Sequence, residues 1–317
     1  MDAVLILNRS AGSLNGDRDA VTPDAVRQAF AGHDMRVEVR LAAPRELPGA
    51  LQRAAADRPG AVLVGGGDGT VSTAAGVFAG KAVPLGVLPL GTLNHFARDL
   101  GFPADWREAV VALAGGVTRR VDVAEVNGRV FINNCSIGSY PEAVRRRDQL
   151  RRQHGRRKWV AMALASLEVF RRLRRFHVCI ETPDTSQRLK TPFVFVGNNR
   201  YSGHLLNSSL RPRLDEGRLS IFTTRAGRKG ALLRLAWQSL VHSVDVAEGL
   251  EALLAAGAAV SSPTGERLPV AVDGELVDLV PPFRFRVRPG ALTVLAPPEA
   301  TSTGPGRTEH AVATVVR

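Results

Sequence analysis

Two kinds of hydrophobic pattern alternate along the first 115 residues. Short apolar or period-two runs, typical of strands, cover residues 3–7, 36–41, 61–64 and 84–88. Helical spacing of apolar residues covers residues 23–30 and 46–56, and three further stretches that open after Gly69, at Gly91-Thr92 and after Asp105. This alternation predicts a parallel sheet with helices on both faces, a three-layer α/β architecture.

The pattern changes near residue 118, where strand-like segments follow one another with short connections. Asn127-Gly128 separates the segments 120–126 and 129–133, and this dipeptide is a strong hairpin signal. Further strands are expected at residues 176–181, 193–196, 219–223, 268–272, 283–287 and 292–295. Helical stretches are expected at residues 144–173 and 231–240.

These patterns divide the chain into three parts. Residues 1–118 are predicted to form the α/β domain. Residues 119–297 are predicted to form a mainly antiparallel β-sandwich domain with a basic helical insertion at 144–175. Residues 298–317, rich in Pro, Gly, Ser and Thr, are predicted to be a disordered tail.

The sharpest chemical signal is the glycine turn Gly65–Thr70, which reads Gly-Gly-Gly-Asp-Gly-Thr between an expected strand and an expected helix. Glycines let backbone N–H groups approach phosphate oxygens, and the helix N-terminus adds partial positive charge. Asp68 would repel a bare phosphate, so its sensible partner is Mg²⁺. The alternative is a plain strand-to-helix turn with Asp68 as the cap. The turn matches neither a Walker A loop nor a Rossmann fingerprint.

A second turn, Pro89–Asn94, follows the next expected strand. Carboxyl ends of parallel strands meet at one edge of a sheet, where ligands of open α/β sheets bind. Thr92 could offer its hydroxyl and Asn94 its amide to a nucleotide there. A plain helix N-cap is the alternative for Thr92.

An acidic turn, Asp273-Gly274-Glu275, follows an apolar strand in the second half. Its carboxylates include a base able to take a proton from an attacking hydroxyl, as phosphoryl transfer requires. An ordinary Asp-Gly hairpin turn is the alternative.

Taken together, the glycine turn and the motif Pro-Leu-Gly-Thr-Leu-Asn-His-Phe-Ala resemble the diacylglycerol kinase catalytic family, specifically its bacterial soluble lipid kinases. Sphingosine and ceramide kinases are relatives of that family, and the resemblance runs from Val4 to about Pro297. It implies ATP and Mg²⁺ as cofactors. The nucleotide site that it implies consists of Asn8, Ser10, Ala11, Gly12, Gly66, Gly67, Asp68, Gly69, Thr70, Val71, Ser72, Thr92 and Asn94.

The resemblance also assigns roles and marks departures. It implies Glu275 as the proton acceptor, with Asp273 and Asp68 as the other catalytic carboxylates. Arg9 stands where the family usually has proline, and His95 where it often has aspartate, which removes one carboxylate from the expected metal network.

A structural Mg²⁺ site is a further implication, because Asp-Glu-Gly-Arg-Leu from Asp215 resembles a family element that binds metal partly through backbone carbonyls. The residues that it implies are Arg213, Asp215, Glu216 and Arg218. Glu216 replaces a usual aspartate, and an acidic turn without metal is the alternative.

The net charge of +12, from 42 Lys and Arg against 30 Asp and Glu, indicates an anionic partner. Residues 145–175 hold twelve basic side chains against two acidic ones, with apolar residues at helical spacing between the basic clusters. This segment is predicted to be a helix that lies on an anionic membrane. The alternative is a packed helix with a solvated basic face. Nucleic acid is not expected, because aromatic residues for base stacking make up only 5%.

Cys135 and Cys179 have no metal-ligand spacing and suggest no disulfide framework, which fits a reducing cytoplasm. No apolar run reaches the roughly 18 residues of a membrane span, and the start of the chain lacks a basic signal-peptide region. The predicted location is cytoplasmic, at the inner face of the membrane. A homodimer is compatible with the sequence, which carries no signal for oligomeric state.

The sequence therefore predicts an ATP-dependent lipid kinase that acts on a lipid hydroxyl, with diacylglycerol as the default substrate. One alternative is a kinase of a soluble substrate that resembles NAD kinase. The other is a non-catalytic protein that binds nucleotide or anionic membranes.

Overall fold

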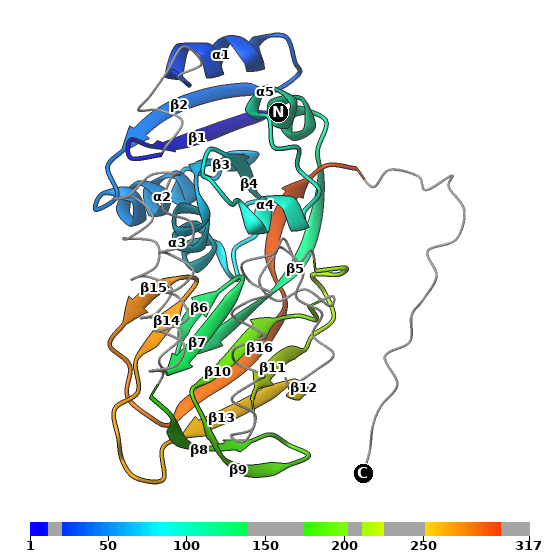
Figure 1. Ribbon diagram of the computed structural model, residues 1–317. Helices are drawn as coiled ribbons and strands as arrows, with labels where there is room; N and C mark the ends of the chain where they lie inside the picture. Colours follow the sequence, from blue (N-terminus) through cyan, green and yellow to red (C-terminus); the bar gives the residue numbers. More distant parts are fainter. Residues whose placement is uncertain (12–20, 139–173, 202–210, 225–250, 299–317) are drawn as a thin grey trace, which may run out of the picture.

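The computed structural model describes residues 1–11, 21–138, 174–201, 211–224 and 251–298 (Figure 1). Several predictions lie outside these residues: the nucleotide contact at Gly12, the helices at 144–173 and 231–240, and almost all of the basic insertion and tail.

The N-terminal half is a parallel sheet in the order β2-β1-β3-β4. Its strands are β1 (Asp2–Asn8), β2 (Arg36–Ala42), β3 (Ala61–Gly66) and β4 (Leu85–Pro89). Its helices are α1 (Pro23–Ala31), α2 (Leu47–Ala56), α3 (Asp68–Phe78), α4 (His95–Asp99) and α5 (Trp106–Ala114). The expected elements are present, with ends that differ by a few residues.

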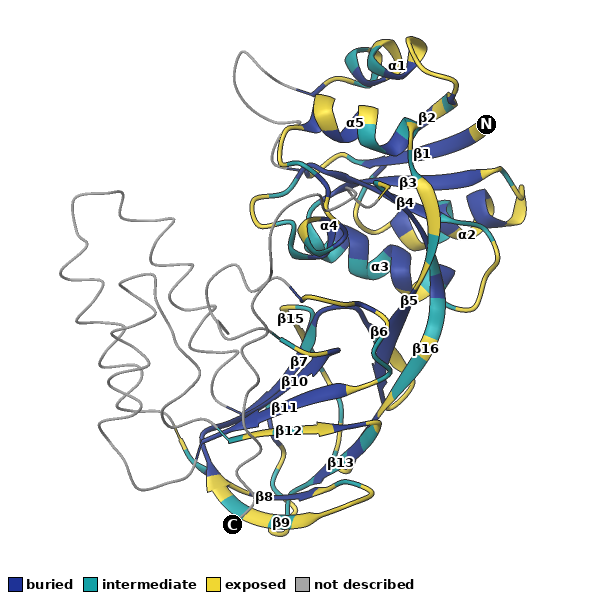
Figure 2. Cartoon of the chain, turned by 90° about the vertical axis from the view of Figure 1, so that its right-hand side faces the viewer, coloured by how far each residue is buried: buried dark blue, intermediate teal, exposed yellow. Residues whose placement is uncertain are grey.

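Helices cover both faces of this sheet. α1 packs against α5 on one side, and α2 and α4 pack against α3 on the other (Figure 1). Apolar residues at helical spacing, such as Val26 and Phe30 of α1, point inward, and the outer sides of the helices are exposed (Figure 2). The predicted three-layer architecture is confirmed.

Local sequence fixes the start of two helices. The Thr22 hydroxyl accepts a hydrogen bond from the Ala25 N–H at 3.1 Å, and Pro23 occupies the first turn. The Asp105 carboxylate accepts from the N–H groups of Arg107 and Glu108 at 2.8 and 3.1 Å. These caps end the preceding loops and begin α1 and α5 where the sequence pattern predicts helices.

α4 departs from expectation. The second turn was expected to open a helix at Gly91-Thr92, but α4 starts at His95, and Leu93, expected on its buried stripe, is 59% exposed. Asn94 precedes the helix in the left-handed region, at φ 49°, and its side chain bonds back to Gly91. The turn is therefore a separate loop rather than the first turn of the helix.

In the C-terminal half, two sheets pack into a sandwich. The smaller sheet has the order β12-β11-β10-β7-β14-β15, and all its neighbours are antiparallel. Its strands are β7 (Asn134–Gly138), β10 (Phe193–Asn198), β11 (Leu219–Thr223), β12 (Glu251–Ala255), β14 (Val270–Val272) and β15 (Glu275–Val277). The predicted antiparallel β-sandwich is confirmed.

The other face of the sandwich belongs to the same large sheet as the parallel strands (Figure 1). It contains β5 (Val117–Val126), β6 (Arg129–Phe131), β8 (Phe176–Glu181), β9 (Ser186–Thr191), β13 (Gly257–Ser261) and β16 (Phe283–Ala296). A buried apolar cluster that includes Phe131, Ile137 and Phe283 fills the space between the two sheets. The hairpin predicted at Asn127-Gly128 joins β5 to β6, although β6 ends at Phe131, two residues earlier than expected.

β16 links the two halves. The separate strands predicted at 283–287 and 292–295 are one strand, with an irregularity in its pairing with β5 between Arg288 and Leu292. Gly290 sits there at φ 55°, and its N–H donates to the buried Asp122 carboxylate at 2.7 Å. One end of β16 pairs with β4 and the other with β13. The predicted division at residue 118 stays a prediction.

A buried ion pair joins the halves next to α4. The Arg211 guanidinium lies 2.6 Å from the Asp99 carboxylate, and the two side chains are 1% and 4% exposed. Arg211 also donates to the carbonyls of Ile132 and Asn198 and to the amide oxygen of Asn133. Asp99 belongs to α4, which follows the second turn, and Ile132 and Asn133 form the connection between β6 and β7. Asn198 is the last residue of β10.

Among the described residues, no helix combines the length and apolar character needed to cross a membrane.

Arg211→Gln is expected to lower the free energy of unfolding by about 3–5 kcal/mol, because it leaves the Asp99 charge buried without its partner. Chemical denaturation followed by circular dichroism measures this change. The control is Arg27→Gln, which removes an exposed ion pair with Asp24 and should cost less than about 1 kcal/mol. Equal losses in both variants would contradict the role assigned to Arg211.

Candidate active site

The two glycine-containing turns meet at the carboxyl edge of the parallel strands. Gly66 ends β3 opposite Pro89, which ends β4, and the Leu90 N–H donates to the Gly66 carbonyl at 3.1 Å. A β-carbon at Gly91 would lie 2.4 Å from the α-carbon of Gly67. The close approach of the two backbones therefore requires glycine here, and it places the second turn beside the N-terminus of α3.

The first loop of the chain packs against the glycine turn. The Asn8 side-chain amide donates to the Thr70 hydroxyl at 2.8 Å, and the Asn8 amide oxygen accepts from the Ser10 N–H at 3.0 Å. The Ala11 N–H donates to the Asn8 carbonyl at 2.9 Å. Three segments predicted to form the nucleotide site thus lie together at one edge.

The side chains of the second turn make local contacts. The Asn94 amide, expected to face a nucleotide, accepts from the Gly91 N–H at 2.9 Å and donates to the Gly91 carbonyl at 2.8 Å. Thr92 is exposed and lies before the N-cap of α4, so the plain N-cap alternative for Thr92 is wrong. A nucleotide contact by either side chain stays a prediction.

Asp68 has the feature expected of a metal ligand. Its Oδ1 atom is buried, and no hydrogen-bond donor reaches it within the described part of the chain. A buried carboxylate oxygen without a donor is costly unless a cation or a water binds it. Mg²⁺ prefers oxygen ligands of this kind, so Asp68 fits the implied metal.

The acidic turn faces the glycine turn from the other half of the molecule. It is a two-residue hairpin between β14 and β15, with Asp273 and Gly274 at φ 45° and 84°. The Glu275 Oε1 atom lies 3.2 Å from the position of a β-carbon at Gly69. β15 lies directly beside α3 in both views (Figures 1 and 2). The turn is therefore an Asp-Gly hairpin, and it places Glu275 at the glycine turn. The role of Glu275 as a base stays a prediction.

The Asp273 carboxylate is held by four donors. Oδ2 accepts from the Ser72 hydroxyl at 2.6 Å and the Ile132 N–H at 3.0 Å. Oδ1 accepts from the N–H groups of Asn133 and Asn134 at 2.8 and 3.0 Å. Burial raises the pKa of the Asp273 carboxyl, and these hydrogen bonds oppose that rise by stabilising the carboxylate. Both Asp273 oxygens therefore accept hydrogen bonds that join the acidic turn to α3 and to the connection between β6 and β7.

The predicted structural metal site has a different arrangement. Arg213 donates two hydrogen bonds to the Asp215 carboxylate, at 2.9 and 3.1 Å. Hydrogen bonding from Arg213 holds the pKa of Asp215 below its ordinary value. The Glu216 carboxylate lies 3.6 Å from Arg200, and the Arg218 carbonyl accepts from the Asn199 N–H. Among the described residues, no group of three or more His, Cys, Asp or Glu side chains could hold a metal ion. Mg²⁺ binding here stays a prediction.

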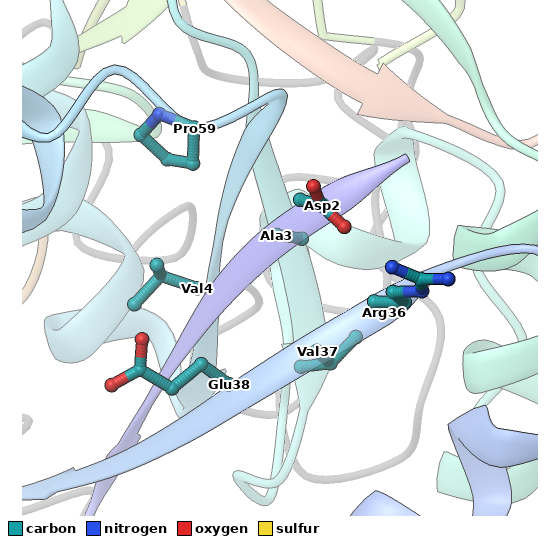
Figure 3. Close-up of a pocket in the computed structure, with 7 residues that line it drawn as sticks. All are labelled: Asp2, Ala3, Val4, Arg36, Val37, Glu38 and Pro59. Atoms are coloured by element: carbon teal, nitrogen blue, oxygen red, sulfur yellow. The ribbon is translucent and has the colours of Figure 1, made fainter.

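A shallow pocket of about 350 Å³ lies at the opposite end of the parallel strands (Figure 3). It is lined by Asp2, Ala3, Val4, Arg36, Val37, Glu38 and Pro59. Because β1 and β2 begin there, the pocket lies away from the carboxyl edge where the three turns meet. It is therefore separate from the candidate active site.

Two arginines near the site had no signal in the sequence. Arg211 supports the β6–β7 connection that binds Asp273, and Arg129 lies 3.4 Å from the other Glu275 oxygen, Oε2. Each is a single basic residue outside any motif. Only the hairpin signal at Asn127-Gly128, directly before Arg129, gave a hint of its position.

Two family models cover most of the chain. Residues 2–126 match the diacylglycerol kinase catalytic domain, and residues 134–296 match the YegS C-terminal NAD kinase beta sandwich-like domain. These matched segments correspond to the parallel-sheet half and the sandwich half.

Named relatives agree with the family models. A Pseudomonas aeruginosa protein named probable lipid kinase YegS-like is 32% identical over 247 residues, which are 74% of this chain and 76% of that protein. A Chromohalobacter salexigens protein of the same name is 30% identical over 93% of each chain. A Mycobacterium tuberculosis protein named diacylglycerol kinase is 31% identical over 58% of this chain and 61% of that protein.

The fold has solved counterparts. A crystal structure of a diacylglycerol kinase from Bacillus anthracis matches 94% of this chain and 97% of that chain with a TM-score of 0.67, at 22% identity. That likeness concerns the fold. The family models, the relatives and the shared turns lead to one conclusion: this chain belongs to the diacylglycerol kinase catalytic-domain family.

Proposed function

We propose that this protein transfers the γ-phosphate of ATP to a hydroxyl of a membrane-derived lipid, with diacylglycerol as the substrate and phosphatidic acid as the product. The observation that carries the proposal is the Glu275 carboxylate beside Gly69, at the N-terminus of α3. The names of the relatives, lipid kinase and diacylglycerol kinase, support the substrate class.

The residues divide the reaction between the two halves. Backbone N–H groups of the glycine turn and the N-terminus of α3 bind the triphosphate. Asp68 would hold Mg²⁺, which neutralises charge on the transferring phosphoryl group. The lipid hydroxyl oxygen attacks the γ-phosphorus, the bond to the ADP oxygen breaks, and Glu275 accepts the hydroxyl proton.

Asp273 acts as a positioning residue in this scheme. Its oxygens are occupied by Ser72 and by three backbone N–H groups, so it fixes the acidic turn against α3 rather than receiving a proton. A carboxylate with four donors is a strong anchor for the neighbouring Glu275.

Membrane contact completes the proposal. The basic segment 145–175 would bring the site to anionic lipid at the inner face of the membrane, because each Lys or Arg near such a surface contributes about 1 kcal/mol. This part rests on the sequence alone. The homodimer stays a prediction.

A phosphorylation assay with labelled ATP and Mg²⁺ tests the function. The protein is offered vesicles that contain diacylglycerol, sphingosine, ceramide or phosphatidylglycerol and, separately, NAD. Labelled phosphatidic acid is the expected product. Labelled NADP would favour the NAD kinase alternative. Vesicle binding without any labelled product would favour the non-catalytic alternative.

Glu275→Gln is expected to lower the turnover number for lipid phosphorylation about 10²- to 10⁴-fold, because the amide cannot accept the hydroxyl proton. Asp68→Asn should weaken binding of ATP in the presence of Mg²⁺, measured by calorimetry. The matched control is Asp278→Asn, an exposed carboxylate just beyond β15 that lies outside the site. Wild-type turnover in the Glu275 variant would refute its role.

Asp273→Asn is expected to cost about 1–3 kcal/mol of unfolding free energy and to reduce turnover, because amide hydrogens would face backbone donors. Ser72→Ala removes one donor of four and should have a smaller effect on both quantities. Denaturation curves and steady-state rates of the two variants make the comparison. A larger loss in the Ser72 variant would show that Asp273 is not the anchor.

A further inference from the structure

Arg129 contacts the carboxylate assigned as the proton acceptor. It is the first residue of β6, and its Nη2 atom lies 3.4 Å from Glu275 Oε2. The other carboxylate oxygen of Glu275, Oε1, is the one that lies beside Gly69. One oxygen of the Glu275 carboxylate thus faces the Arg129 guanidinium and the other faces the glycine turn.

The backbone around Arg129 is firmly placed. Asn127 accepts from the Arg284 N–H at 2.7 Å and donates its own N–H to the Arg284 carbonyl at 3.0 Å. Arg129 pairs with Val126 in the hairpin, and β6 packs against α3. The structure thus holds the α-carbon of Arg129 beside the helix whose N-terminus forms the site.

The side chain, in contrast, is free to exchange partners. The Arg129 and Glu275 side chains are 48% and 60% exposed, and an ion pair exposed to this extent is weak. A second anion that arrives nearby can therefore replace the carboxylate at small cost.

The charge balance of the site calls for such a cation. The glycine turn Gly65–Thr70 contains no lysine or arginine, unlike a Walker A loop. Asp68, Asp273 and Glu275 all bring negative charge to the place where a triphosphate would bind. Phosphoryl transfer requires positive groups at the oxygens of the transferring phosphoryl group, a role often filled by arginine.

We propose that Arg129 binds the γ-phosphoryl group of ATP. Its guanidinium leaves the Glu275 carboxylate for the phosphoryl oxygens, and Glu275 is then free to receive the proton of the lipid hydroxyl. This inference rests on the proposed function for its site and adds the residue that recognises the transferred group.

A contact between Arg129 and the γ-phosphoryl group can be tested without lipid. ATP and ADP differ by the γ-phosphoryl group alone, so a residue that contacts this group contributes to binding of ATP and not of ADP. A residue that only supports the hairpin or raises the local potential affects both nucleotides.

Calorimetric titration of the full chain with ATP and with ADP, each with Mg²⁺ and without lipid, tests the proposal. Arg129→Gln should weaken ATP binding about 10- to 100-fold and leave ADP binding within about 2-fold of wild type. Arg129→Lys keeps the charge without the planar geometry, so its affinity for ATP should fall between that of the wild type and that of Arg129→Gln. The matched control is Arg27→Gln, whose arginine side chain is 50% exposed and paired with Asp24 on α1.

Equal weakening of ATP and ADP, or no weakening of either, would overturn the proposal. Thermal unfolding of each variant identifies any loss of folding. If Arg129→Gln is unstable, Arg129→Lys replaces it in the ATP and ADP titrations. If no lipid is phosphorylated but ATP binding still depends selectively on Arg129, the proposed substrate fails and this inference stands.

Discussion

The Asp273 carboxylate is the contact on which the candidate site depends. Its two oxygens bring together α3, the connection between β6 and β7, and the hairpin β14–β15, which are far apart in the chain. This meeting point attaches the hairpin that carries Glu275 to α3, the helix that follows the glycine turn. A proton acceptor must lie within reach of the reacting hydroxyl, so the anchor determines what the arrangement can do.

A second buried charge supports the first. Arg211 binds the carbonyl of Ile132 and the side chain of Asn133, the same residues whose N–H groups bind Asp273. Its ion pair with Asp99 ties this connection to α4, beside the second turn. Burying these charges is costly, and the cost is offset only because each charged group has several hydrogen bonds. The polar network therefore holds the glycine turn, the second turn and the acidic turn in one arrangement.

Local signals predicted much of the fold, because helix caps, glycine turns and hairpin dipeptides act over a few residues. The helix expected after Asp105 and the hairpin expected at Asn127-Gly128 are both present. Features that depend on distant partners escaped prediction. Pro289-Gly290 interrupts the apolar pattern and suggested two strands, whereas pairing with β4, β5 and β13 keeps β16 continuous. Arg211 carries no local pattern, since its partners are more than ten residues away in sequence.

The continuity of β16 limits how the enzyme can move. One strand is hydrogen-bonded to β4 in the first half and to β13 in the second, and β5 follows it along most of its length. A hinge rotation between the halves would break this ladder of main-chain hydrogen bonds. Movement at the candidate site is therefore confined to side chains and loops around a stiff frame, and the spacing between the parallel-sheet half and the sandwich half is built into one strand.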